Sequence, residues 1–179
     1  HHFRRALAIE PLYHYAYLHL SRLALHRADP ADALALASAS LHAVPSPNPH
    51  GHLLASRALL ELHRASSPMA AEEMETAACA SGAPAAASSA CRVPSTMLAR
   101  SLEHVQLAIG STDPGAAEAG DSWSTLGEVL SLQGRWADAV DAFGRAAQLR
   151  PTDSSLQINT GAALLQHNRP AESLAHFER

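Results

Sequence analysis

The chain of 179 residues carries a net charge of −4 at pH 7, and aromatic residues make up only 4% of it. This charge argues against a nucleic-acid-binding protein, for which a basic stripe is expected. No apolar run is long enough to span a bilayer, so we expect no membrane insertion by this segment. Cys79 and Cys91 are the only cysteines. They are too few for a disulfide scaffold or a cysteine zinc site, and a reduced, cytoplasmic setting is the expectation.

The first two segments predict three helices. Residues 1–13 contain a helix over 1–9 and are interpreted as the second half of a helix pair. Residues 14–47 form a complete pair, whose inter-helix turn is Asp29-Pro30. Asp29 suits the N-cap position, and Pro30 suits the first helical position because no N–H is needed there.

Residues 48–84 are predicted to form a third pair. Its first helix, over 51–64, ends in Leu-His-Arg-Ala, a copy of the four residues that follow Ala24. Ser67-Pro68 resembles the turn of the preceding pair, with a cap residue followed by proline. Arg57 stands where an apolar residue is expected, so this pair is an imperfect one.

The stretch 78–94 is rich in alanine and serine and has almost no periodicity. We expect it to be mobile, either as a short degenerate helix or as a loop, because such side chains bury little apolar area. An amphipathic helix over 95–109 follows, and a loop over 110–120. Together these features predict a degenerate unit over residues 85–119.

The most regular unit covers residues 120–153. Its characteristic residues are Trp123, Leu126, Gly127, Leu130, Gly134, Ala139, Phe143, Ala146 and Pro151. Trp123, Leu126 and Leu130 share one helix face, and we expect the tryptophan to be buried between the two helices of its own unit. Gly127 indicates a close helix crossing, and Gly134 a left-handed helix end. This spacing resembles that of the tetratricopeptide repeat family, whose unit is a helix–turn–helix of about 34 residues.

The resemblance extends over the whole chain. Residues 154–179 match as a partial unit. The positions equivalent to the aromatic residue of the second helix are Phe3, Ala37, Met74, Val105, Phe143 and Phe177, at intervals of 34, 37, 31, 38 and 34. The resemblance implies an all-α fold, a right-handed superhelical solenoid of antiparallel helix pairs. Since no polar capping helix is evident at either end, we expect a segment of a longer protein.

No residue pattern indicates chemistry. The twelve histidines include His50 and His52, but none falls in a recognised zinc motif or beside carboxylates at ligand spacing. Neither a nucleophile–base arrangement nor a glycine-rich phosphate loop is evident. We therefore expect no enzymatic activity, no metal site and no cofactor.

The resemblance also implies where a partner binds. In tetratricopeptide solenoids the first helices of the pairs line a concave groove that receives a peptide or a helix of a partner protein. In this register the candidate partner-binding residues are Tyr15, His19, Arg22, His26, His52, His63, Asp121, Thr125, Glu128 and Asn159. The alternative is that they are only the solvated face of each first helix.

Some members of the family hold a C-terminal carboxylate with a clamp of lysines, arginine and asparagines. This chain contains no lysine, and Arg22 and Asn159 lie in separate repeats, so this mode is disfavoured. The resulting hypothesis is a protein-interaction scaffold that binds a protein or peptide and no nucleic acid. The alternative is a non-catalytic arm of a larger enzyme, such as a glycosyltransferase, that presents substrates or partners. The oligomeric state is not indicated.

Overall fold

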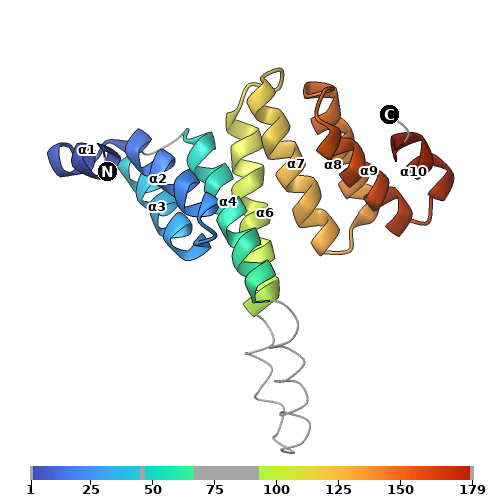
Figure 1. Cartoon of the computed structure of the whole chain (residues 1–179), viewed down its shortest axis with the longest axis horizontal. Coiled ribbons are helices and arrows are strands. Elements are labelled where there is room, and N and C mark those ends of the chain that lie inside the picture. The colour runs from blue at the N-terminus through green and yellow to red at the C-terminus, as the bar shows by residue number, and fades with distance from the viewer. Residues whose placement is uncertain (1, 45–46, 67–92, 178–179) are drawn as a thin grey trace, which may run out of the picture.

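The residues that the structure describes, 2–44, 47–66 and 93–177 of a computed structural model, form nine helices and no strand. This confirms the all-α prediction. The helices, labelled in Figure 1, are α1 (His2–Ile9), α2 (His14–His26), α3 (Pro30–Ala43), α4 (Pro49–Ala65), α6 (Val93–Ser111), α7 (Ala117–Leu132), α8 (Trp136–Leu149), α9 (Ser154–Gln166) and α10 (Pro170–Phe177). Ser67-Pro68 and all but the last two residues of the stretch 78–94 lie outside the described ranges. In those ranges no helix is both long and apolar enough to cross a membrane.

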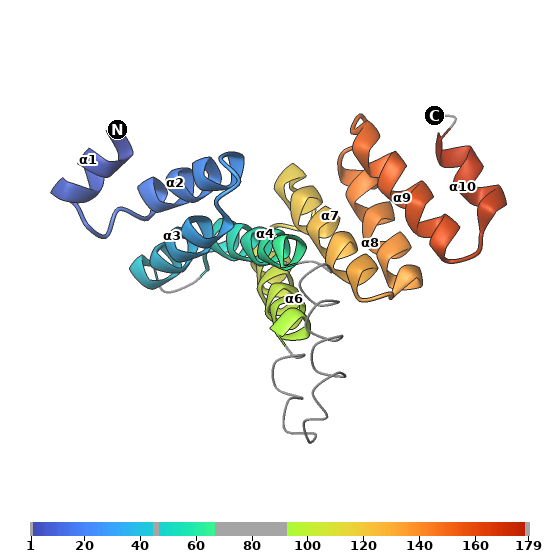
Figure 2. The ribbon, with the colours of Figure 1, turned by 60° about the horizontal axis from the view of Figure 1, so that its bottom comes forward.

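The helices are stacked as pairs in a single row, with the two ends of the chain at opposite ends of it (Figure 1). The pairs are α2 with α3, α4 with α6, α7 with α8, and α9 with α10. The row is curved, so that α6 lies at its lowest part when α1 and α10 are raised (Figure 2). This arrangement is a helical solenoid, as the sequence pattern predicted.

Local capping explains where several helices begin. The Asp29 carboxylate accepts a hydrogen bond from the Asp32 N–H at 3.1 Å, and α3 starts at Pro30 as predicted. Asn48 caps α4 in the same way, accepting from the Gly51 N–H at 2.9 Å. Because Asn48 is the cap, α4 starts at Pro49 rather than at residue 51.

The predicted left-handed helix end at Gly134 is confirmed, with φ of +74°. The predicted loop over 110–120 is shorter than expected, since α6 continues to Ser111 and α7 begins at Ala117. The Ser111 and Thr112 hydroxyls donate to carbonyls of the last helical turn, at 2.5 and 2.7 Å. These bonds satisfy acceptors that the end of a helix otherwise leaves open.

Small residues mark the point where the two helices of a pair cross. In the pair of α2 and α3, the buried Ser21 hydroxyl donates to the Ala33 carbonyl at 2.8 Å. In the pair of α9 and α10, the Ser173 hydroxyl donates to the Gly161 carbonyl, also at 2.8 Å. In each case a side chain of one helix reaches the backbone of the other, which requires the close approach that small residues permit.

The same crossing exists between α4 and α6. Ser56 and Ser101 are both fully buried, and each hydroxyl lies 3.0 Å from the carbonyl oxygen of the other residue. Ser56 and Ser101 are therefore the structural equivalents, in this pair, of Ser21 and Ala33. The α4 and α6 helices are thus packed as the two members of one pair.

This pairing changes the interpretation of the degenerate unit predicted over 85–119. Ser56 and Ser101 are 45 positions apart, whereas Ser21 and Ala33 are 12 apart, a difference of 33. The extra 33 residues are close to one repeat length. The intervals between the aromatic-equivalent positions therefore cannot distinguish an insertion within a pair from a separate repeat. We propose that α4 and α6 form a single unit that contains the stretch 78–94. The first part of the predicted unit, 85–92, lies outside the described residues.

The best-formed core lies in the unit predicted to be most regular. Leu130, Ala139, Phe143 and Ala146 of α7 and α8 are buried there, together with Leu156 of α9. Trp123 is only partly buried at the edge of this core, and the Arg145 guanidinium lies 4.5 Å from the centroid of its ring. Trp123 is therefore less buried than expected, because an arginine of α8, the second helix of the same pair, lies over one face of its ring in place of an apolar side chain.

Gly127 should tolerate a side chain poorly. A Cβ atom there would lie 2.6–2.8 Å from three ring atoms of Phe143, which is itself buried, whereas a Cβ at Gly144 of α8 would meet nothing within 4 Å. We expect Gly127→Ala to lower the free energy of unfolding by about 1–3 kcal/mol, through overpacking. Gly144→Ala, the matched control, should be neutral or raise it by up to about 1 kcal/mol, through helix propensity. Urea unfolding compares the two, and an equal effect would contradict the close crossing at Gly127.

Phe143 should contribute more to stability than Trp123. Phe143 is 2% exposed at the centre of the core, and Trp123 lies at its edge. Phe143→Ala should cost about 3–5 kcal/mol, the usual range for a buried phenylalanine. Trp123→Ala should cost less, despite the larger side chain. Thermal and urea unfolding of both variants measure the two losses of stability. A larger loss for Trp123→Ala would show that the tryptophan contributes more to the core than Phe143.

Candidate partner-binding groove

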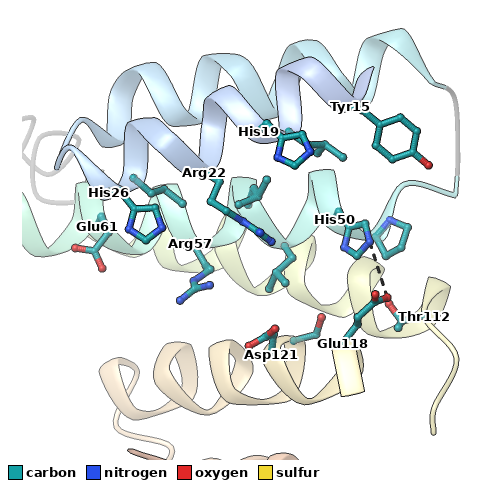
Figure 3. A pocket seen from close by; sticks show the side chains of 16 residues that line it. Tyr15, His19, Arg22, His26, His50, Arg57, Glu61, Thr112, Glu118 and Asp121 are labelled. Carbon is teal, nitrogen blue, oxygen red and sulfur yellow. Dashed lines mark ion pairs between the residues drawn. The ribbon is translucent and has the colours of Figure 1, made fainter. Parts of the chain in front are cut away.

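A hollow of about 660 Å³ lies between α2, α4 and the beginning of α7 (Figure 3). Each of these three helices is the first helix of its pair. The side chains labelled in Figure 3 are Tyr15, His19, Arg22, His26, His50, Arg57, Glu61, Thr112, Glu118 and Asp121. We call this hollow the groove.

The α2 wall of the groove contains the stripe that the sequence indicated. Tyr15, His19, Arg22 and His26 are spaced at i, i+4, i+7 and i+11, and all four line the hollow. The His19 ring stacks on Phe3 of α1, with ring centroids 4.8 Å apart and an interplanar angle of 13°. The short α1 helix thereby fixes the orientation of one groove side chain.

The α4 wall differs from the one expected. His52 and His63 do not line the groove, and His50, Arg57 and Glu61 do. The His52 Nδ1 atom instead lies 3.0 Å from the Nδ1 atom of His104 on α6. The expected groove face of α4 is therefore turned toward the neighbouring helix.

The predicted register of α4 relative to α2 is wrong by two residues. It follows the Leu-His-Arg-Ala copies at the helix ends, which are 37 positions apart. The buried serines Ser21 and Ser56 are the structural equivalents, and they are 35 positions apart. The repeated Ser-Arg dipeptide, at Ser21-Arg22 and at Ser56-Arg57, is the sequence signal that would have given the correct register.

The remaining predicted residues fall into two groups. Asp121 lines the groove, but Thr125 is 3% exposed and donates its hydroxyl to the Asp121 carbonyl at 2.9 Å. Glu128 and Asn159 border a second hollow, of about 300 Å³, between α7 and α9. The ten candidate residues therefore do not form one surface: five line the groove, two border the second hollow and three lie elsewhere.

Ion pairs beside the groove join neighbouring helices. Arg64 of α4 binds Glu61 at 2.6 Å and reaches Glu128 of α7 at 2.8 Å. Burial opposes the charge of Arg64, but the hydrogen bonds and charges of Glu128 and Glu61 together outweigh it, so the pKa of this guanidinium is raised. Arg150 binds Asp121 of α7 and, at 2.7 Å, Asp153.

His52 and His104 form a pair outside the groove, between α4 and α6. Burial lowers the pKa of His52. Burial also lowers the pKa of His104, with His52 and Arg100 acting in the same direction and Glu103 opposing them. Two neutral rings can share one N–H···N hydrogen bond between their Nδ1 atoms, and this bond is lost when both Nδ1 atoms carry a proton.

This pair should make stability depend on pH. Because both folded pKa values lie below the ordinary value, the unfolded chain binds these protons more readily than the folded protein. The free energy of unfolding should therefore fall as the pH decreases through about 6.5, the ordinary histidine value. Replacing both rings, as His52→Gln with His104→Gln, should flatten that dependence. His42→Gln, which changes an exposed ring, should not, and an identical pH profile for both variants would exclude a role of the pair.

Among the described residues no group of three or more histidine, cysteine or carboxylate side chains is placed to hold a metal ion. The geometry of the groove is that of a hollow surface formed by successive first helices of a helical-repeat solenoid. Such a surface defines the class of the protein as a repeat protein rather than a compact single-core domain.

One unit and the fold can be compared with known proteins. Residues 120–153 match the family described as Tetratricopeptide repeat, so the most regular unit is similar to the repeats of that family. This confirms the resemblance stated from the sequence. The chain as a whole has the solenoid fold of tetratricopeptide-repeat proteins.

Two solved structures illustrate the similarity. The crystal structure of MamA is 13% identical, with a TM-score of 0.68, over 98% of this chain and 81% of that one. TTC0263, a thermophilic TPR protein in Thermus thermophilus, is 20% identical, with a TM-score of 0.71, over 98% of this chain and 76% of that one. At these identities the similarity establishes the fold alone. The comparison with curated proteins gave no match.

Proposed function

We propose that this protein is a protein-interaction scaffold and that the groove holds a peptide or helical segment of a partner protein. The observation that carries the proposal is the groove itself, a hollow of about 660 Å³ between helices of successive repeats. Its volume is in the range typical of binding sites. Tyrosine and arginine, which are enriched among residues that dominate binding energy, line it at Tyr15, Arg22 and Arg57.

The arrangement of the groove favours binding over catalysis. Two of its carboxylates, Glu61 and Asp121, are held by Arg64 and Arg150 as parts of ion pairs between or along helices. A carboxylate held in this way is poorly placed to act as a general base, because its oxygens already accept hydrogen bonds from a guanidinium. We therefore propose a non-catalytic role, and the same groove would serve a repeat arm of a larger enzyme equally well.

Filling the groove should weaken binding. Leu53 lines the groove, and Leu107 is 54% exposed on α6 and does not line it. Peptides selected from a random phage-displayed library against the full chain provide the probes. Leu53→Trp should weaken the selected peptides by about tenfold or more, equivalent to ~1.4 kcal/mol, because the indole occupies the hollow. Leu107→Trp is the matched control and should leave binding unchanged.

Fluorescence polarisation measures both affinities. The proposed function fails if the library yields no binding peptide, or if peptides bind Leu53→Trp as tightly as the wild type. A circular dichroism melt checks that each variant is folded, since the added tryptophan could otherwise act through stability.

A further inference from the structure

Arg22 and Arg57 occupy the same position on two successive first helices. Each follows directly on a fully buried serine, Ser21 or Ser56, that is hydrogen-bonded to the paired helix. The buried serine fixes the rotation of its helix, so the next residue, about 100° further round, is held at the groove. Figure 3 shows both arginine side chains extending from α2 and α4 into the groove.

Among the described residues, these two arginines are the charged groove side chains that have no ion-pair partner, since neither has a carboxylate within ion-pair distance. The groove carboxylates Glu61 and Asp121 are bound by Arg64 and Arg150, which do not line the groove. Glu118 lies 3.9 Å from His50, at the end of the groove near Thr112 (Figure 3). Arg22 and Arg57 are therefore the groove cations whose guanidinium groups are available to a carboxylate of a partner.

Guanidinium groups select for carboxylates. Their planar fork donates two parallel hydrogen bonds to one carboxylate, and such charge-assisted bonds are roughly twice as strong as neutral ones. Packed helices lie about 8–10 Å apart, and alternate side chains of an extended segment lie about 7 Å apart on one face. Two carboxylates at positions i and i+2 can thus each reach one arginine through the flexible side chains.

We propose that the groove binds an extended acidic segment of a partner protein, in which two carboxylate side chains at i and i+2 are held by Arg22 and Arg57. This assignment rests on the proposed function and specifies the chemistry of the partner. A nucleic acid is the less favoured occupant. Glu61, Glu118 and Asp121 line the same groove, and the consecutive phosphates of a nucleic acid would lie close to these carboxylates.

The test uses the full chain and two labelled peptides of equal length, one with Glu-x-Glu and one with Gln-x-Gln at its centre. The wild type should bind the glutamate peptide about tenfold more tightly, a difference of ~1.4 kcal/mol, and added salt should reduce the difference. Arg22→Ala with Arg57→Ala should remove it, and each single variant should remove part. Arg5→Ala with Arg100→Ala, which deletes two exposed arginines that do not line the groove, is the matched control for net charge.

A charge reversal gives an independent readout. Arg22→Glu with Arg57→Glu should lose the glutamate peptide and gain a Lys-x-Lys peptide, a gain that an unfolded variant could not show. Equal affinity of the wild type for the glutamate and glutamine peptides, or no binding of the glutamate peptide, would overturn the proposal. Equal losses in the groove and control double variants would overturn it as well, as would tighter binding of a single-stranded oligonucleotide than of the glutamate peptide.

The two proposals fail in different ways. If Leu53→Trp weakens selected peptides while the arginine variants bind them normally, the groove is a binding site without acidic preference. If Leu53→Trp has no effect on any peptide, the groove itself is not the site.

Discussion

The crossing of two helices at small residues is the constraint on which this solenoid depends. Ser21 reaches the Ala33 carbonyl, and Ser56 and Ser101 reach the backbone of each other. Where glycine replaces serine, the partner helix supplies an aromatic ring instead, and Phe143 covers Gly127 within van der Waals distance. A larger residue at any of these crossings would separate the helices and change the angle at which the next pair is added.

The rotation of each first helix, and hence the chemistry of the groove, follows from these crossings. The residue after the small one faces the groove in α2 and α4, and it is arginine in both. In α7 the equivalent residue is Glu128, which is bound by Arg64 of the preceding first helix. The charge of this position therefore changes sign along the row, from arginine in α2 and α4 to glutamate in α7, and the glutamate is held by an ion pair beside the second hollow.

The pair of α4 and α6 is closed by the same kind of contact as the pair of α2 and α3. Its two serines meet across the helices, although 33 more residues separate them along the chain than separate Ser21 and Ala33. The solenoid therefore continues through this unit without a break in the row (Figure 1).

The sequence by itself determined the local features of this protein. Helical periodicity, the Asp29-Pro30 start of α3, the left-handed end at Gly134 and the tight crossing at Gly127 depend on neighbouring residues, and all could be predicted from their spacing. The common face of the α2 stripe could be predicted for the same reason, since it needs only the period of one helix.

Only the tertiary structure decided which helices are paired and which face of α4 lines the groove. The interval between Ala37 and Val105 is about two repeat lengths. It fits two units of ordinary length as well as one long unit, because the spacing of residues along the chain does not show which helices are in contact. Contact between Ser56 and Ser101, 45 positions apart, resolves the pairing. The same contact fixes the rotation of α4, turning His52 toward His104 and Arg57 into the groove, because a buried hydroxyl needs a partner that only the folded neighbour provides.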